Sequence, residues 1–361
     1  MSSTISDHMI ALKQVKNWAP FKIDALGLVT LLGAGQVDQA VGRLSRNRFI
    51  DHLPFLALNV VAGDDISQSQ PGYAVYNFSD AVVTSQLAPW FTRWLAAQDF
   101  TQCSSLIHVT YDANGTSLSR WHSALSMIIS SVVLVSMVLL AGLTRDWWAF
   151  VNAVSLIVSV VCRRYILHEL LHSIDTAVGT VPEHDPARKQ VKCLVQFPNG
   201  KALTLFTSRG VLTKLLLPRP APLHHRRYNL FRYIAWLGFG FHVISLGMSA
   251  LASQLATVVV LLLSTALLVF RVLAVEDRIG SKMMIRRLDM KGERESYGRA
   301  YSRLKLTDEE ENSLVAWNLA PQRTNVDWWN RYRAGLADSD DTQLSKFLEN
   351  VLPKGEAMAW R

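Results

Sequence analysis

The segment SMIISSVVLVSMVLLAGL at residues 126–143 decides the fold class of this chain. It lies inside a run of 24 residues, from Trp121 to Thr144, that contains no Asp, Glu, Lys or Arg. The hydrocarbon core of a bilayer is about 30 Å thick, so a helix needs about 20 apolar residues to cross it. The run therefore predicts a transmembrane helix, and the chain is expected to be an integral membrane protein.

A second charge-free run of 16 residues follows at 147–162, after an interruption of two charged residues. It is short for a span, but Arg163 and Arg164 can extend their charged groups to the interface while apolar residues beyond them lengthen the helix. A buried helix of a soluble domain is the alternative. Because the run adjoins a definite span, we expect a transmembrane hairpin over 121–167.

The second apolar cluster runs from Tyr233 to Phe270, 38 residues without a formal charge. As one helix it would be about 57 Å long, far more than one span requires. It must fold back, and its least apolar point lies at 252–254. We therefore expect helices near 232–251 and 254–273, which form a second transmembrane hairpin.

Charge places the remaining segments relative to the membrane. Residues 163–232 carry 12 Lys and Arg against 4 Asp and Glu, and residues 271–361 carry 16 Lys and Arg. Cytoplasmic loops are rich in Lys and Arg, so both segments are expected in the cytoplasm, and four spans then leave both termini there. Spans of this length suit a thin bilayer such as that of the endoplasmic reticulum.

Residues 1–120 contain no run long enough to span and are expected to form an N-terminal cytoplasmic region. The stretch WFTRWLAA places Trp90, Trp94 and Ala97 on one helix face. This face predicts either an interfacial helix on the membrane or, the interpretation we favour, a helix packed against a core. The sequons at Asn77 and Asn114 are interpreted as chance matches, because this region is expected on the cytoplasmic side.

The basic cytoplasmic linker 168–231 contains a change of periodicity. Apolar and polar residues alternate over 191–197, a Pro-Asn-Gly turn follows, and ALTLFT at 202–207 has the composition of a second strand. A further turn leads into VLTKLLL at 211–217. Segment 190–217 is therefore expected to be a small antiparallel β meander between the two hairpins, in a protein that is otherwise mainly α.

The linker ends in His224, His225, Arg226 and Arg227, directly before the third predicted span. Such a cluster can bind anionic lipid headgroups. The simpler interpretation, which we favour, is that these residues only anchor the helix end on the cytoplasmic side.

The C-terminal tail, 274–361, is also basic and is expected in the cytoplasm. The sequence Thr307-Asp308-Glu309-Glu310 has the pattern of a capping box at the start of a helix. The following aromatic stretch, NVDWWNRYR at 325–333, resembles a nucleic-acid patch in composition. In a multispan protein we instead expect it to pack against the membrane surface or the meander, and we expect no nucleic-acid partner.

One motif in the chain has the spacing of a metal site. His168-Glu169-Leu170-Leu171-His172 matches HExxH, in which two histidines on one helix face hold Zn²⁺ and the glutamate acts as general base. Zinc also needs a third protein ligand. Glu183, His184 and Asp185 are the nearest candidates, and no extended metzincin pattern follows. We therefore expect no bound zinc and no cofactor, and no catalytic residue is assigned.

A lone histidine, His242, falls inside the third predicted span. Ionisable residues within the membrane are functional candidates by default. A neutral imidazole bonded to Ser245 or to a neighbouring helix explains this one equally well. No charged residue lies deep inside any predicted span, which argues against an ion-coupled transporter.

The turn FPNGKALTLF at 197–206 and the tail WNLAPQRTNVDWWNRYR at 317–333 resemble those of uncharacterised multispan membrane proteins of filamentous fungi. The resemblance covers roughly the last two-thirds of the chain and includes the two apolar hairpins around a basic linker. It implies an accessory role in a secondary-metabolite pathway, and it carries over no functional residues.

These observations favour a membrane accessory or scaffold protein, in contact with the lipid bilayer and with protein partners on the cytoplasmic side. A different class of function stays open, that of a membrane-embedded zinc metallohydrolase using His168, Glu169 and His172. A third hypothesis is a small-molecule transporter assembled from several copies of the chain.

Overall fold

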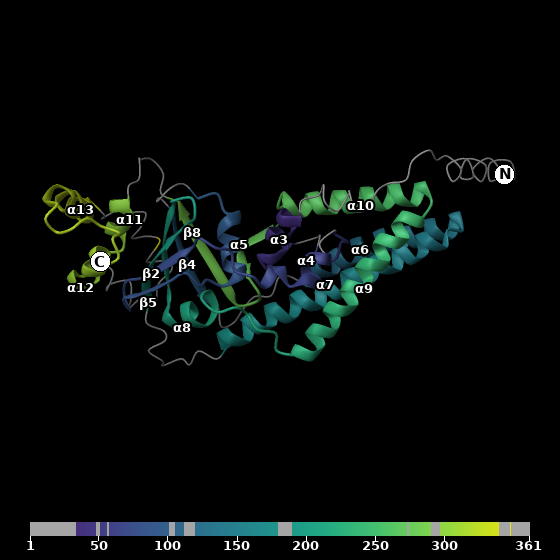
Figure 1. Cartoon of the computed structure of the whole chain (residues 1–361), viewed down its shortest axis with the longest axis horizontal. Helices are drawn as coiled ribbons and strands as arrows, with labels where there is room; N and C mark the ends of the chain where they lie inside the picture. Colours follow the sequence, from purple (N-terminus) through teal and green to yellow (C-terminus); the bar gives the residue numbers. More distant parts are fainter. Residues whose placement is uncertain are drawn as a thin grey trace. The chain divides into compact units, whose positions relative to one another are not determined.

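The computed structural model of the chain (Figure 1) describes residues 34–47, 51–55, 58–100, 105–111, 120–179, 190–272, 274–289, 297–338 and 347. The chain divides into two compact units, each built from segments far apart in sequence. The helical unit comprises Met1–Gln68, Thr116–Asp175 and Pro220–Ser281. The sheet unit comprises Ser69–Gly115, Thr176–Arg219 and Lys282–Arg361. The predicted N-terminal region 1–120 thus contributes to both units.

Four long helices dominate the described residues: α6 (Arg120–Thr144), α7 (Trp147–Gly179), α9 (His225–Met248) and α10 (Leu251–Val269). All four are long and apolar enough to cross a membrane by length and composition. They support the prediction of an integral membrane protein that is mainly α-helical, with a separate sheet.

The break between α9 and α10 lies at Ser249 and Ala250, so the prediction of a break at 252–254 was wrong. Asp146, which separates α6 from α7, explains the position of the break. One of its carboxylate oxygens accepts the backbone N–H groups of Trp148 and Ala149, at 3.1 and 3.2 Å. The other oxygen accepts the N–H of Ala250 at 2.6 Å. A single carboxylate therefore caps the start of α7 and holds the start of α10.

Apolar side chains pack these helices together inside the helical unit. Met137 of α6, Ala153 and Leu156 of α7 and Leu261 of α10 form one buried cluster. Other large apolar side chains of α6 remain exposed, among them Val132 and Leu139. Such exposed residues would face lipid in a transmembrane helix, where the surroundings are as apolar as the helix itself.

The N-terminal segment of the helical unit packs on these long helices. It contains α3 (Ala34–Gly42), β1 (Ser45–Asn47), α4 (Leu58–Gly63) and the 3₁₀ turn η1 (Asp65–Ser67), and β1 pairs with β7 (Ala274–Ile279). The buried guanidinium of Arg163 in α7 donates to the backbone carbonyls of Asp51 and Leu53, at 2.9 and 2.6 Å. The same guanidinium lies over the Phe55 ring. Arg163 thus holds the loop between β1 and α4.

The strands of the sheet unit run in the spatial order β8-β4-β6-β5-β2-β3. Among the strands that the structure describes in this unit, only β4 and β6 pair in parallel, and the other neighbours are antiparallel. The strands are β2 (Ala74–Asn77), β3 (Val82–Thr84), β4 (Ser105–Tyr111), β5 (Gln190–Gln196), β6 (Ala202–Ser208) and β8 (Met283–Asp289).

The predicted meander at 190–217 is correct for its first two strands and wrong for the third. β5 and β6 form an antiparallel hairpin around a turn in which Gly200 has a positive φ of 78°. The next segment is helical instead, with α8 (Arg209–Val211) and the π-helical turn η3 (Leu212–Leu216). The Ser208 hydroxyl caps this helical segment by accepting the N–H of Val211. β4, from a distant part of the chain, occupies the position beside β6 that a third strand would have taken.

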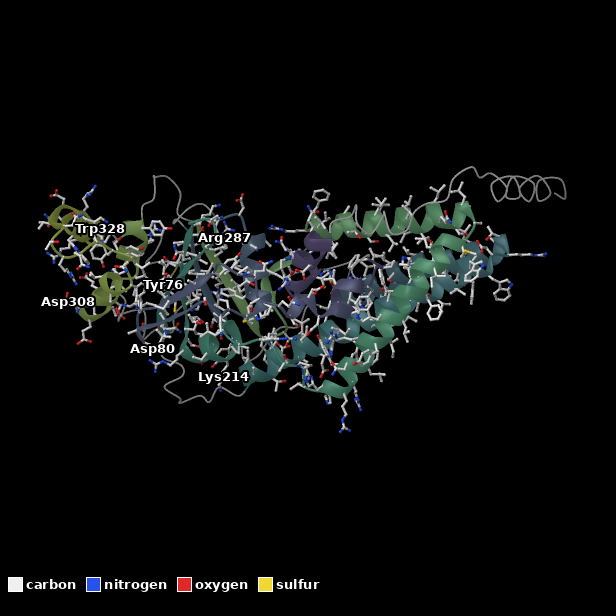
Figure 2. All side chains as sticks on the ribbon, in the orientation of Figure 1. Tyr76, Asp80, Lys214, Arg287, Asp308 and Trp328 are labelled. Carbon is white, nitrogen blue, oxygen red and sulfur yellow. The ribbon has the colours of Figure 1, made fainter. Side chains whose placement is uncertain are left out.

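Three C-terminal helices, α11 (Tyr297–Arg303), α12 (Asp308–Ala316) and α13 (Val326–Asp338), cover one face of the sheet (Figure 1). Their residues share a buried cluster with side chains from β4, β5 and β6. Figure 2 labels Tyr76 on β2 and Trp328 on α13, and both side chains are partly buried against this cluster. Packing of the aromatic tail against the predicted strands is therefore confirmed.

Helix α5 (Pro89–Ala97) also belongs to the sheet unit. Trp90, Trp94 and Ala97, the residues that define its apolar face, are all buried. The ring of Trp94 contacts that of Phe100, which in turn contacts Phe197 at the end of β5. The core-face interpretation of this helix is therefore confirmed over the interfacial one.

Candidate functional site

The HExxH sequence lies on α7, where its three key side chains point to different surroundings. His168 and His172 are exposed, with ring centroids 6.0 Å apart. Glu169 is only 4% exposed. The helix therefore presents the two imidazoles together, as the spacing predicts, but directs the carboxylate into the protein.

Glu169 is bound to the start of another helix. Its Oε1 atom accepts the backbone N–H of His224 at 2.5 Å and lies 3.0 Å from Nδ1 of the same residue. His224 directly precedes α9, whose first N–H groups lack partners within the helix. A carboxylate at this position is favourable because it faces the positive end of the helix dipole. The geometry thus assigns Glu169 a structural contact between α7 and α9.

The ligand set that zinc would require is incomplete within the described residues. No group of three or more His, Cys, Asp or Glu side chains among them is arranged to hold a metal ion. The candidate third ligands Glu183, His184 and Asp185 lie outside the described residues. The expectation that the protein binds no zinc stays a prediction.

His242 belongs to a buried polar chain that joins three helices. Its Nδ1 atom lies 2.7 Å from Oδ1 of Asn152 in α7, and Asn152 donates through Nδ2 to the Thr257 hydroxyl of α10 at 2.9 Å. The Thr257 hydroxyl donates in turn to the Ser253 carbonyl. Hydrogen bonds of this kind join helices within membranes. The alternative in which His242 bonds to a neighbouring helix is confirmed.

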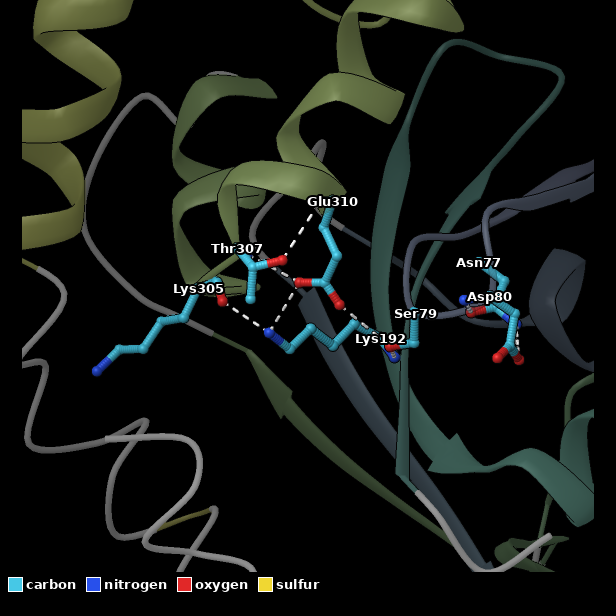
Figure 3. Close-up of polar contacts among 7 residues, drawn as sticks. All are labelled: Asn77, Ser79, Asp80, Lys192, Lys305, Thr307 and Glu310. Atoms are coloured by element: carbon cyan, nitrogen blue, oxygen red, sulfur yellow. Dashed lines mark hydrogen bonds and ion pairs between the residues drawn. The ribbon is translucent and has the colours of Figure 1, made fainter. Parts of the chain in front are cut away.

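In the sheet unit, Lys192 on β5 links the sheet to the C-terminal helices (Figure 3). Its ammonium group donates to the Lys305 carbonyl at 2.6 Å and pairs with Glu310 Oε2 at 3.1 Å. The backbone N–H of Lys192 donates to the Ser79 hydroxyl, which donates to Glu310 Oε1 at 3.5 Å. Side chains from the β2–β3 turn, from β5 and from α12 therefore meet in one polar cluster.

Glu310 also completes the predicted capping box. Its Oε2 accepts the Thr307 N–H at 2.9 Å, while the Thr307 hydroxyl accepts the Glu310 N–H at 3.3 Å. The sequence pattern is sufficient to predict this local pair. It gives no indication of Lys192, because that residue is 118 positions away and arrives through the pairing of strands.

The sequon at Asn77 forms part of the same turn. Asn77 is buried, and its amide nitrogen, the atom that a glycan would occupy, donates to Asp80 at 2.9 Å. Asp80 also pairs with the Arg209 guanidinium. These contacts give Asn77 and Asp80 a role in stabilising the turn, which agrees with a chance match to the sequon. The second sequon, at Asn114, lies outside the described residues.

His108 on β4 is a buried titratable side chain that the sequence did not single out. It is 1% exposed, and neither ring nitrogen has a hydrogen-bond partner among the described residues. Burial, together with the positive charge of Arg286 on β8, lowers the pKa of His108 to about 4. At neutral pH the ring is therefore an uncharged packing group beside Phe206, its partner on β6.

The outer edge of the sheet is the three-residue strand β3, which carries no charge. Among the described residues, β3 pairs only with β2. Val82 and Val83 are 49% and 43% exposed, and residues 81–86, AVVTSQ, carry no charge. Natural proteins usually protect an edge strand with Lys, Pro or a bulge, because its free N–H and C=O groups can pair with another strand.

Comparisons of the chain with protein-family models, with curated proteins and with solved structures found no match.

Proposed function

We propose that the protein is a multi-pass membrane scaffold whose sheet unit binds a protein partner along strand β3. The observation that carries this proposal is the uncharged edge with exposed Val82 and Val83. An extended peptide can add a strand to such an edge. Backbone hydrogen bonds then supply affinity and the alternate side chains supply specificity.

The order of the strands along the chain supports a four-span topology for this scaffold. β4 precedes α6, β6 lies between α7 and α9, and β8 follows α10, yet β4 is hydrogen-bonded to both β6 and β8. Strands of one open sheet must share one side of a bilayer. An even number of crossings therefore separates them, in agreement with two hairpins of two spans. The excess of Lys and Arg in these segments favours the cytoplasmic side, including both termini.

The contacts of the two key glutamates favour the scaffold over the metallohydrolase. A general base must be within hydrogen-bond reach of the proton that it removes. Glu169 is instead bonded to His224, and Glu310 to Lys192 and Thr307. The scaffold proposal retains the expectations of a location in the endoplasmic reticulum and of a role beside fungal secondary-metabolite enzymes.

The test is deletion of the gene with metabolite profiling, followed by complementation. We expect Glu169→Gln to restore the wild-type profile, because the amide oxygen can still accept the His224 N–H. Val83→Lys adds a charge to the edge. We expect this variant to be expressed at the membrane but not to restore the wild-type metabolite profile. Thr213→Lys, at an exposed position of η3, is the matched control and should rescue.

The opposite pattern would replace the proposal. If Glu169→Gln is stably expressed and fails while Val83→Lys rescues, the metallohydrolase hypothesis takes its place. If both variants rescue, the β3 edge is not the binding surface.

A further inference from the structure

The first turn of α9 carries a group of exposed basic side chains that the scaffold proposal does not use. His225, Arg226 and Arg227 are all exposed. Among the residues that the structure describes, no carboxylate is paired with either guanidinium, whereas Arg232, one and a half turns further along, lies 3.7 Å from Asp64. The two arginines are therefore free to contact something outside the chain.

The surrounding sequence leaves this charge uncompensated. Residues 186–275 contain no Asp or Glu, while ten Lys and Arg residues fall between 188 and 232. Two acids among the described residues lie against this part of α9. Glu169 is buried and bonded to His224, and Asp64 accepts the Tyr228 hydroxyl at 3.0 Å and lies 3.7 Å from Arg232. Their charges offset part of the local potential, but neither is paired with the exposed Arg226 or Arg227.

The position of the arginines on α9 sets their depth relative to a membrane. Leu230, Tyr233 and Leu237 follow on the same helix and are large, apolar or aromatic, and exposed. At 1.5 Å per residue, Tyr233 lies about 10 Å along the helix from Arg226. Tyrosines favour the boundary between headgroups and acyl chains. Arg226 and Arg227 then fall at the level of the lipid phosphates.

We propose that the first turn of α9 binds the phosphate headgroup of an anionic phospholipid. Guanidinium groups match phosphate oxygens with paired hydrogen bonds, and the N–H groups of the first helical turn point toward the same region. The lipid-facing side chains of α9 can hold the acyl chains of the same molecule. The occupant is therefore a lipid rather than a free phosphate.

Native mass spectrometry of the full-length protein in mild detergent tests the proposal. Phosphatidic acid and phosphatidylcholine with identical acyl chains are titrated separately, and we expect phosphatidic acid to bind at least about tenfold more tightly. Each basic residue near an anionic headgroup contributes about 1 kcal/mol. Replacing both arginines, in Arg226→Gln/Arg227→Gln, should then weaken binding about 30-fold.

The matched control is Arg331→Gln/Arg333→Gln, which removes two exposed arginines from α13 and should leave lipid affinity unchanged. Binding in micelles does not depend on the direction of membrane insertion, so a change of topology cannot mimic the result. The wild-type preference for phosphatidic acid provides a readout that needs no variant. Equal binding of the two lipids, equal loss in both double variants, or release of the lipid by excess inorganic phosphate would each overturn the proposal.

Discussion

Two glutamates, one in each unit, perform the same task in different ways. Glu169 in the helical unit accepts the N–H of His224, 55 residues away, at the start of α9. Glu310 in the sheet unit accepts the N–H of Thr307, three residues away, at the start of its own helix. The first joins two helices, and the second stabilises one helix end. The comparison shows that an identical hydrogen bond can determine either tertiary or local structure, depending on the separation in sequence.

The consequences of removing each glutamate differ accordingly. A helix start with a local cap has further polar groups and water available, and loss of a cap costs about 1 kcal/mol. Loss of Glu169 should cost more, about 1.5–3 kcal/mol, because its buried carboxylate joins two helices through a hydrogen bond to a charged acceptor.

Glu169→Ala should lower the free energy of unfolding by about 2–3 kcal/mol, because it removes the charged acceptor through which the His224 N–H joins α9 to α7. Glu169→Gln keeps an acceptor oxygen and should cost about 1 kcal/mol or less. Unfolding of the purified protein in mixed micelles measures both values. Equal destabilisation by the two variants would show that the charge, rather than the hydrogen bond, joins α7 to α9.

Acid should weaken the sheet unit through His108. Burial lowers its folded pKa to about 4 from an ordinary value of 6.5. The contribution of the neutral His108 ring to the free energy of unfolding is therefore fully present above pH 6.5. It is lost as the pH falls toward 4, because the ring is protonated in the unfolded chain before it is protonated in the folded protein. The loss should reach about 2 kcal/mol at pH 5.

His108→Leu should remove this part of the acid sensitivity, which can be followed by the protection of β4 amides from hydrogen exchange. A readout confined to the sheet is needed because the pKa of His52, in the helical unit, is also lowered to about 4 by burial and by Arg164. Unchanged acid sensitivity of β4 in His108→Leu would mean that burial of the neutral His108 ring does not cause it.

Lys192→Met should destabilise the attachment of α12 by about 1–2 kcal/mol, because the Lys305 carbonyl and Glu310 lose a charged donor while the aliphatic packing is kept. Hydrogen exchange of α12 amides measures the effect. Lys214→Met, at an exposed position, is the control. If α12 exchanges at the same rate in both variants, the polar cluster does not hold the helix on the sheet.

Thr307→Ala should cost about 1 kcal/mol, the ordinary value for loss of an N-cap. The effect should be confined to α12, and hydrogen exchange can separate it from the rest of the unit. Thr307→Ser retains the hydroxyl and should be nearly neutral. A loss from Thr307→Ala as large as that from Glu169→Ala would remove the distinction between the two glutamates.

Features encoded by neighbouring residues could be predicted from the sequence. The length of the charge-free runs predicts the four long helices, and the alternation of apolar and polar residues over 191–197 predicts β5. The three-residue separation of Thr307 and Glu310 predicts the capping box at the start of α12. Each signal is complete within one segment. The prediction of a third strand in the meander failed because segment 211–217 is apolar enough to form either a strand or a helix. Only the pairing of β6 with β4 decides between the two.

Contacts made across the chain left no comparable signal. Nothing near Glu169 indicates that His224 will meet its carboxylate, so the HExxH spacing suggested a general base where the structure has a contact between two helices. Arg163 likewise appears in the sequence as a residue at a helix end, yet its guanidinium is enclosed by the loop 51–55. Both positions depend on the fold of the whole helical unit.

The pairing of β4 sets the time at which the sheet unit can form during synthesis. Leu106 of β4 can pair with Thr204 of β6 only after about a hundred more residues have been synthesised. Ile107 can pair with Arg287 of β8 only after α10 has been synthesised. Contacts so distant in sequence form slowly. If the four helices insert in order, the sheet closes only when the last of them is in place, and a failed insertion leaves β4 with unpaired edges. Completion of the sheet would thus report that the chain has been inserted correctly, and unpaired strands are the kind of surface that aggregates.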